Sequence, residues 1–274
     1  MTELTTSGNS RLAPGSVDRL VFEFPLAERV RGWLRLEEQF RRAKQLALRR
    51  DALDHRAALL ALFEILDTAT RSDLKSDLLH ELDRQRLIWS TQAENPEIEQ
   101  GALSEFLRDL DTVLSDLHAQ VGRPGQHLRD IDWLVQVRQR AASPSGVCTV
   151  ELPMLGAWLA QPEALRKADL QRWLEPFSPL EEAITLLLRL LRESGVPCAE
   201  LAHLGSFQRS LDGTRAPLLA IVRVDAGWAA VPELSANRYM INIRWLEHGG
   251  HFMRSGRATA STRDIPFELT LCRL

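Results

Sequence analysis

The residues of this chain best placed for binding chemistry are arginines at helical spacing. Four of them recur at intervals of four and seven and therefore share one face of a helix: Arg31, Arg35, Arg42 and Arg49. The guanidinium group is a planar fork that donates paired hydrogen bonds, so a row of arginines favours carboxylate ligands. The alternative is that the row is simply the solvated side of an amphipathic helix.

Other residues that could do chemistry give weaker signals. His248 and His251 flank a Gly-Gly turn without an evident third metal ligand, so we expect a polar loop. Cys148 lies in an apolar run, which predicts a buried structural thiol. His80 shares a helical stretch with Glu81 and Arg84, typical of a solvated face. With no phosphate-loop, dinucleotide, zinc-protease or serine-hydrolase motif, the sequence predicts no enzyme, no cofactor and no metal.

Composition limits what the arginines can mean. The net charge is -3 and 45% of the residues are hydrophobic, which suits a chain with a packed core rather than a general nucleic-acid binder. The charge is uneven: residues 25–50 hold eight basic and three acidic side chains, and residues 51–125 hold seven and fifteen. The three cysteines are far apart, and no apolar run approaches the ~20 residues that span a bilayer. We expect a cytoplasmic protein without membrane insertion.

The elements that must position the arginines begin with a strand and a helix. In residues 19–24, the large apolar residues Leu20, Phe22 and Phe24 alternate with Arg19, Val21 and Glu23. This alternation predicts a half-buried strand, which Pro25 ends. Apolar residues then recur at helical spacing: Leu26, Val30, Trp33, Leu34 and Phe40. This stretch therefore predicts a helix with an apolar side and a basic side.

Further helices are predicted over most of the chain up to residue 192, interrupted by an isolated β signal at 147–152. The last 70 residues carry β signals at 218–224, 239–245 and 266–272. The fold class we predict is α+β, with a helical domain packed beside a mostly antiparallel β domain that also takes in the strands at 19–24 and 147–152. The expected boundaries are a disordered tail over 1–18, a helical domain over 25–146 and 153–203, and a β domain over 204–274.

Four blocks of the sequence, in order, resemble one bacterial family. They are FEFPLAERVRGWLRLE, LLHELDRQ, VRQRAASPSGVCTVELPMLGAWL and PLEEAITLLLRLLRESG, and they extend from Phe22 to Gly195. This combination is similar to ZapD, a family of cell division proteins that bind and bundle filaments of the tubulin homologue FtsZ. The resemblance implies a helical domain plus a β domain, a homodimer, and no enzymatic activity.

The same resemblance implies which residues take part. Positions matching the family's basic residues give an FtsZ-tail contact set of Arg31, Arg35, Arg129, Arg138 and Arg140. Arg71 matches an arginine of the dimer contact. Asp132 and Gly156 depart from the family, in which these positions hold a basic residue and a histidine.

The partner implied is the C-terminal tail of FtsZ, a short acidic and apolar segment on a flexible linker. Such a segment loses conformational entropy on binding, so an affinity of about micromolar is expected at one site. The resemblance also implies localisation at mid-cell with the Z ring. The competing hypothesis is a nucleic-acid-binding protein that uses its arginine-rich helix faces, against which the acidic middle of the chain argues.

Overall fold

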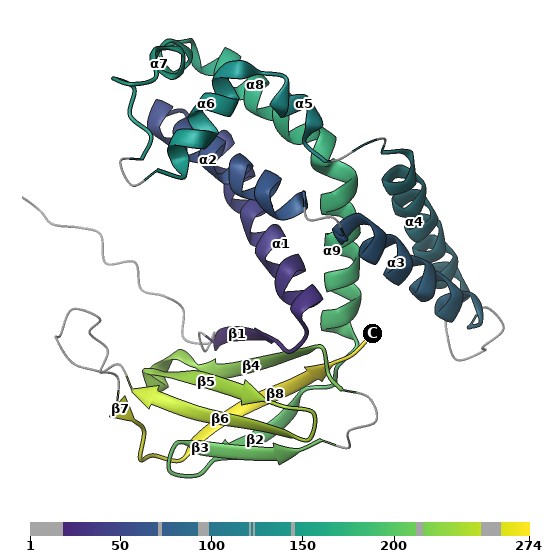
Figure 1. Cartoon of the computed structure of the whole chain (residues 1–274). Coiled ribbons are helices and arrows are strands. Elements are labelled where there is room, and N and C mark those ends of the chain that lie inside the picture. Colours follow the sequence, from purple (N-terminus) through teal and green to yellow (C-terminus); the bar gives the residue numbers. More distant parts are fainter. Residues whose placement is uncertain are drawn as a thin grey trace, which may run out of the picture. The chain divides into compact units, whose positions relative to one another are not determined.

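The computed structural model describes residues 19–70, 73–92, 99–120, 122, 124–143, 146–211, 216–247 and 259–274. These residues form two units, one of strands and one of helices. The β unit takes residues 19–26 and Gly195–Arg273, and the helical unit takes Ala27–Ser194. The α+β class predicted from the sequence is confirmed (Figure 1). The tail expected over 1–18 lies outside the described residues.

The β unit consists of two antiparallel sheets with a shared core. The first has the order β1-β4-β8-β2, from Arg19–Pro25, Leu219–Asp225, Ile265–Cys272 and Cys198–Ala202. The second has the order β3-β6-β5, from Ser206–Ser210, Met240–Glu247 and Ala230–Ala236, with β7 (Thr259–Ala260) also paired to β6. Trp245 of β6 meets Phe267 of β8 edge to face, with ring centroids 5.4 Å apart, so the two sheets pack through aromatic side chains.

The predicted N-terminal strand is confirmed as part of this unit. β1 pairs antiparallel with β4, and its register sets Phe22 opposite Val222 and Phe24 opposite Ala220. Phe22 and Phe24 pack on the core between the sheets, which is why every second residue of β1 is apolar. A segment nearly 200 residues away from β4 in sequence therefore completes its sheet.

The strand predicted over 147–152 is wrong. Residues 149–151 form a turn, closed by a hydrogen bond of 3.3 Å from the Glu151 N–H to the Cys148 carbonyl, and Val150 is 86% exposed. The segment lies in the helical unit, where none of the described residues offers a strand to pair with it, and β-branched side chains do not form a strand without a partner. Cys148 is consequently exposed, so the buried thiol expected there is also wrong.

The helical unit is arranged around α1 (Glu28–Ala47). The helix α2 (Ala52–Ala69) returns antiparallel along it, and the Asp51 side chain accepts a hydrogen bond of 2.6 Å from the Leu53 N–H at its start. The long helix α9 (Ser178–Glu193) also packs on α1, and Arg192 donates two hydrogen bonds, of 2.7 and 2.6 Å, to the Glu37 carboxylate.

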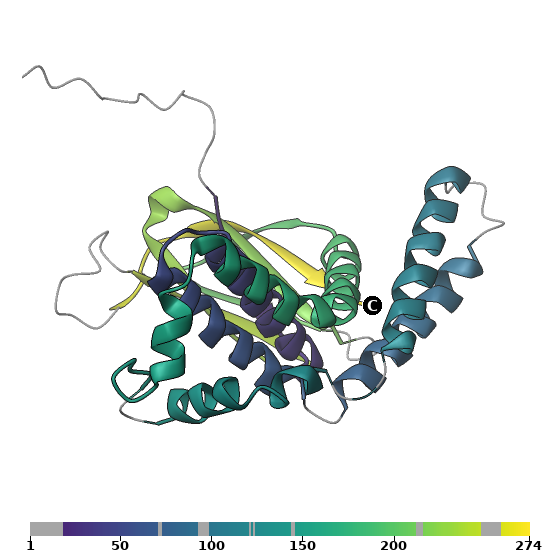
Figure 2. The same cartoon turned by 90° about the horizontal axis from the view of Figure 1, so that it is seen from above.

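The remaining helices form two groups. The helices α3 (Leu74–Ser90) and α4 (Gln100–Ala119) run side by side as a hairpin (Figure 1, Figure 2). They contact the rest of the unit mainly through α9, and α3 also reaches α1 through Glu81 and Arg29. The other group consists of α5 (Gln126–Arg129), α6 (Asp132–Ala141), α7 (Pro153–Leu159) and α8 (Glu163–Leu174), with the short turn η1 (Glu175–Phe177) before α9. One tryptophan from each of α6, α7 and α8 joins a cluster with ring centroids 5.6 to 5.9 Å apart: Trp133, Trp158 and Trp173.

Two buried tryptophans should respond differently to loss of the indole nitrogen. Trp245 is fully buried, and its Nε1–H has no acceptor among the described residues, whereas Trp158 Nε1 donates to Asp169 Oδ2 at 3.1 Å. Trp245→Phe removes an unsatisfied donor and should lower the free energy of unfolding by about 1 kcal/mol less than Trp158→Phe. Urea denaturation of both variants measures the difference, and an equal or larger loss for Trp245→Phe would contradict it.

Candidate functional site

The helix α1 has two chemically distinct faces. Five residues along one stripe are buried: Val30, Trp33, Leu36, Phe40 and Ala43. This confirms the predicted apolar side, although Leu36 takes the buried place expected for Leu34, and Leu26 lies before the helix. The other side of the helix carries the arginines and faces solvent.

The arginines of α1 are mostly engaged by carboxylates. Arg31 Nε lies 3.1 Å from Glu28, Arg42 pairs with Glu64 of α2, and Arg49 lies 3.4 Å from Asp54. Three of the four residues in the row are therefore ion-paired, and the row is not a continuous positive surface.

Arg35 is the exception in this row. Its side chain is exposed, and the part of the chain that the structure describes gives it no hydrogen-bond or ion-pair partner. All the N–H donors of the Arg35 guanidinium group are therefore available to a ligand. Arg35 does not have to give up an ion pair within the protein to bind one.

The arginines of the third sequence block lie on α6. Arg138 donates to Asp67 of α2 from Nε at 3.0 Å, and Arg140 lies 3.7 Å from Glu151. Arg42 of α1 pairs with Glu64 of α2, and the two helices are antiparallel. Asp67 follows Glu64 by about one helical turn, so it lies about one turn closer than Glu64 to the N-terminal end of α1. Arg138 is thereby held beside the α1–α2 pair.

The structure does not bring the whole predicted set together. Arg129 ends α5, is exposed, and has no partner among the described residues. None of the contacts described joins Arg35 to the arginines of α5 and α6. Asp132 begins α6, and a Cβ placed on Gly156 in α7 would meet Thr149 at 3.8 Å, an ordinary contact.

Three of the residues singled out in the sequence lie outside the described residues: Arg71, His248 and His251. Among the residues that the structure describes, no three His, Cys, Asp or Glu side chains are close enough to hold a metal ion. No helix in the described ranges is both long and apolar enough to cross a membrane.

Sequence reasoning missed a buried carboxylate in the second block. The Glu81 side chain, expected on a solvated face, is only 1% exposed and bridges two helices. Arg84 reaches it at 2.5 Å and Gln85 at 2.9 Å from within α3, and Arg29 of α1 reaches it at 2.9 Å. Burial alone would raise the pKa of Glu81, but these hydrogen bonds and the two positive charges outweigh burial, so its pKa is lowered. The spacing of the LLHELDRQ block is thus explained by a structural network.

A second buried polar group was also missed. Arg166 of α8 is buried and donates from Nε to His55 Nδ1 at 2.9 Å and from Nη2 to the Arg50 carbonyl at 3.1 Å. His55 Nε2 in turn lies 2.7 Å from the Arg49 carbonyl, so the ring is the tautomer that carries its hydrogen on Nε2. The group fixes the α1–α2 turn to α8, and an isolated Arg or His in a sequence gives no signal of such burial.

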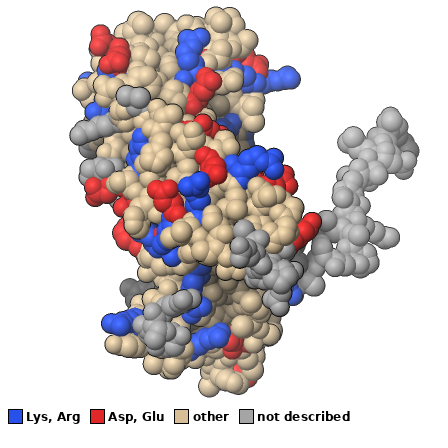
Figure 3. Space-filling view, turned by 90° about the vertical axis from the view of Figure 1, so that its right-hand side faces the viewer, with Lys and Arg blue, Asp and Glu red and all other residues tan. Residues whose placement is uncertain are grey.

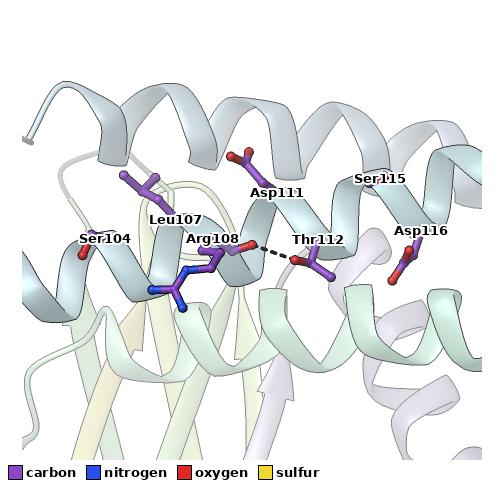
Figure 4. Close-up of a pocket in the computed structure, with 7 residues that line it drawn as sticks. All are labelled: Ser104, Leu107, Arg108, Asp111, Thr112, Ser115 and Asp116. Atoms are coloured by element: carbon purple, nitrogen blue, oxygen red, sulfur yellow. Dashed lines mark hydrogen bonds between the residues drawn. The ribbon is translucent and has the colours of Figure 1, made fainter.

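A surface depression in the helical unit does not bring together polar side chains from several elements, as a binding site usually does. It lies along α4, where seven residues line it: Ser104, Leu107, Arg108, Asp111, Thr112, Ser115 and Asp116 (Figure 4). The side chains come from a single helix, and Thr112 Oγ1 donates to its own helix, to the Arg108 carbonyl, at 2.9 Å. On the face of the molecule drawn in Figure 3, basic and acidic side chains are interspersed. The face drawn in Figure 3 does not show the broad positive surface that a nucleic-acid backbone favours.

Comparison with known proteins identifies the family. The family model for ZapD, described as a cell division protein, matches residues 34–244. The chain belongs to the ZapD family. The cell division protein ZapD of Azoarcus sp. strain BH72 is 42% identical over 253 residues, which cover 92% of this chain and 99% of that protein.

Other ZapD relatives match over a similar length. The protein of Aromatoleum aromaticum is 43% identical over 256 residues, covering 92% of this chain and 97% of that protein. The protein of Ralstonia nicotianae is 41% identical over 253 residues, covering 92% and 99%. The similarity therefore extends over both units, and the chain has a role in cell division.

Glu81 should make stability depend on pH. A carboxylate whose pKa is lowered in the folded state stabilises that state above its unfolded pKa of about 4.3, and this stabilisation is lost as pH falls through the lower folded value. Glu81→Gln should therefore lower the free energy of unfolding by about 1–3 kcal/mol at pH 7. The deficit relative to wild type should shrink below pH 4.

The measurement is urea denaturation at pH 7 and at pH 3.5. Glu105→Gln, which changes an exposed carboxylate on α4, is the control and should differ from wild type by less than about 0.5 kcal/mol. A deficit for Glu81→Gln that is the same at both pH values would show that Glu81 does not contribute through its charge.

Proposed function

We propose that this protein binds the C-terminal tail of FtsZ and, as a homodimer, crosslinks and bundles FtsZ filaments in the Z ring at mid-cell. Membership of the ZapD family supports the role in division, and the four sequence blocks support the partner. The single observation that carries the binding proposal is Arg35, exposed and without a partner in the described part of the chain. The proposal involves no cofactor and no catalysis.

The chemistry of the tail suits such a site. Its acidic side chains accept charge-assisted hydrogen bonds from arginine, which contribute about 1.5–3 kcal/mol each and fix the register of the peptide. Its apolar side chains supply the remaining contact area. Because the segment is flexible before binding, ordering it offsets part of this gain, and a single site is expected to bind at about micromolar strength. Salt should weaken the interaction.

The other arginines of the predicted contact set should contribute unequally to binding of the tail. Arg31 flanks Arg35 on α1 and already holds Glu28. Arg138 and Arg140 would have to exchange Asp67 and Glu151 for the tail, so each should contribute less than Arg35. Arg129 is exposed and needs no exchange, but it sits on a different helix. Arg35 is therefore the residue on which the binding proposal depends most.

Reversal of Arg35 tests the site. Arg35→Glu should weaken binding of a labelled FtsZ tail peptide at least tenfold, because it removes a donor and places a like charge against the acidic tail. Arg41→Glu is the matched control, since Arg41 is an exposed arginine of α1 that is engaged with Glu38. Fluorescence anisotropy measures both affinities, and circular dichroism checks that both variants remain folded. If Arg35→Glu binds the peptide as tightly as wild type, the proposed site is wrong.

Dimerisation is the second requirement, because a monomer with one site can decorate a filament but cannot link two. In a dimer, binding of the second tail becomes effectively intramolecular, which raises the overall affinity roughly a hundredfold or more. Arg71 tests this requirement, because the family resemblance implies that it takes part in the dimer contact. Arg71→Glu should give a monomer in light scattering that still binds the tail peptide but no longer bundles filaments. A monomeric variant that bundles fully would refute crosslinking by the dimer.

A further inference from the structure

His55 of α2 has no capacity left for a second proton. Of the described histidines it alone is fully buried. Its Nε2–H donates to the Arg49 carbonyl at 2.7 Å, and its Nδ1 accepts from Arg166 Nε at 2.9 Å. A neutral imidazole has one donor and one acceptor, and both are used here. The contacts therefore require the ring to be neutral.

Arg166 of α8 brings a buried positive charge against this ring. Its Nη1 donates to the Leu159 carbonyl at 3.1 Å and to the Gln161 carbonyl, and its Nη2 donates to the Arg50 carbonyl at 3.1 Å. No carboxylate in the part of the chain that the structure describes contacts either Arg166 or His55. Neutral acceptors alone offset the burial of the guanidinium group, and His55 Nδ1 is one of them.

A proton added to His55 would reverse the Nδ1 contact. It can bind only Nδ1, because Nε2 already carries a hydrogen. Nδ1 would then be a donor facing the Nε–H donor of Arg166, and an imidazolium would lie beside a guanidinium in a buried site. Two like charges and an unpaired buried N–H are both unfavourable, so protonation should separate the ring from Arg166.

The charged groups nearby do not compensate for this. Four carboxylates lie within about one helical turn of His55 on α2 or of Arg166 on α8. Each already has a partner: Asp51 the Leu53 N–H, Asp54 the Arg49 side chain, Glu163 the Lys167 side chain, and Asp169 the Trp158 Nε1–H.

The remaining neighbours supply no further negative charge. Glu163 interacts electrostatically with His55, which favours a proton on the ring, but Lys167 Nζ holds it at 2.6 Å and Arg50 also acts on it. The helix α7 contains no charged residue. In the last turn of α1, Lys44 pairs with Glu181 of α9. An imidazolium at position 55 would therefore be left without a carboxylate in contact.

We propose that the His55–Arg166 contact is an acid-sensitive latch, closed while His55 is neutral and opened when it takes a proton. Histidine is the side chain that ordinarily gains a proton between about pH 7 and pH 5. The hydrogen bonds of the latch end on carbonyl groups of two turns, one between α1 and α2 and the other between α7 and α8. Acid should release these two turns from each other. The inference does not depend on the partner that the protein binds.

Thermal unfolding against pH tests the latch. The folded state excludes a proton from His55 and the unfolded chain does not, so acid should lower Tm. Between pH 7.5 and pH 5.5, the Tm of wild type should fall by about 2–4 °C more than that of His55→Gln, whose amide offers a donor and an acceptor but takes no proton. His80→Gln, a change of an exposed histidine on α3, is the control and should lose as much as wild type. Equal losses in wild type and His55→Gln would overturn the latch.

Hydrogen exchange in the wild type tests the same claim without a variant. From pH 7.5 to pH 5.5, after correction for the intrinsic exchange rate, protection should fall about tenfold in residues 48–56 and 159–167. Residues 103–117 of α4 should keep theirs. Unchanged protection in the two turns would overturn the latch. An equal loss in all three segments would mean general unfolding by acid and would overturn it as well.

Discussion

Burial of one side of α1 is the constraint on which the helical unit depends. Five side chains of this helix are buried against its neighbours: Val30, Trp33, Leu36, Phe40 and Ala43. Each large one contributes about 1.5–3 kcal/mol, whereas an ion pair at the surface contributes about 0–1 kcal/mol. The apolar stripe therefore sets the rotation of α1, and the ion pairs of its arginines follow from that rotation. Arg35 is left in solvent because the opposite side of the helix is fixed in the core.

Buried polar groups add a second layer of constraint. The Glu81 network joins α3 to α1, and the Arg166–His55 group joins α8 to the α1–α2 turn. Groups of this kind are costly to bury unless every partner is in place, so they favour a single arrangement of the helices. They contact α1 near both of its ends, through Arg29 at one end and through the carbonyl groups of Arg49 and Arg50 just beyond the other.

The sequence predicts the elements well where their side-chain pattern is regular, as in β1, β4, β6 and β8. It fails where pairing depends on distant residues. The strand β5 was missed because Pro232 interrupts its pattern, yet β5 is an edge strand, where a missing N–H is tolerated. The segment 147–152 has strand composition but lies among helices and forms a turn. For the site, spacing identified the arginine row, but the carboxylates that neutralise Arg42 and Arg138 come from α2, and no local pattern reveals them.

We propose that the protein links filaments through the FtsZ tail. The sharpest test is low-speed co-sedimentation of FtsZ filaments with this protein, in which full-length FtsZ is compared with FtsZ lacking its C-terminal tail. Bundles of full-length FtsZ should pellet together with the protein, whereas tail-less filaments should stay in the supernatant with the protein. Equal pelleting of both kinds of filament would show that the contact lies elsewhere on FtsZ and would overturn the proposal.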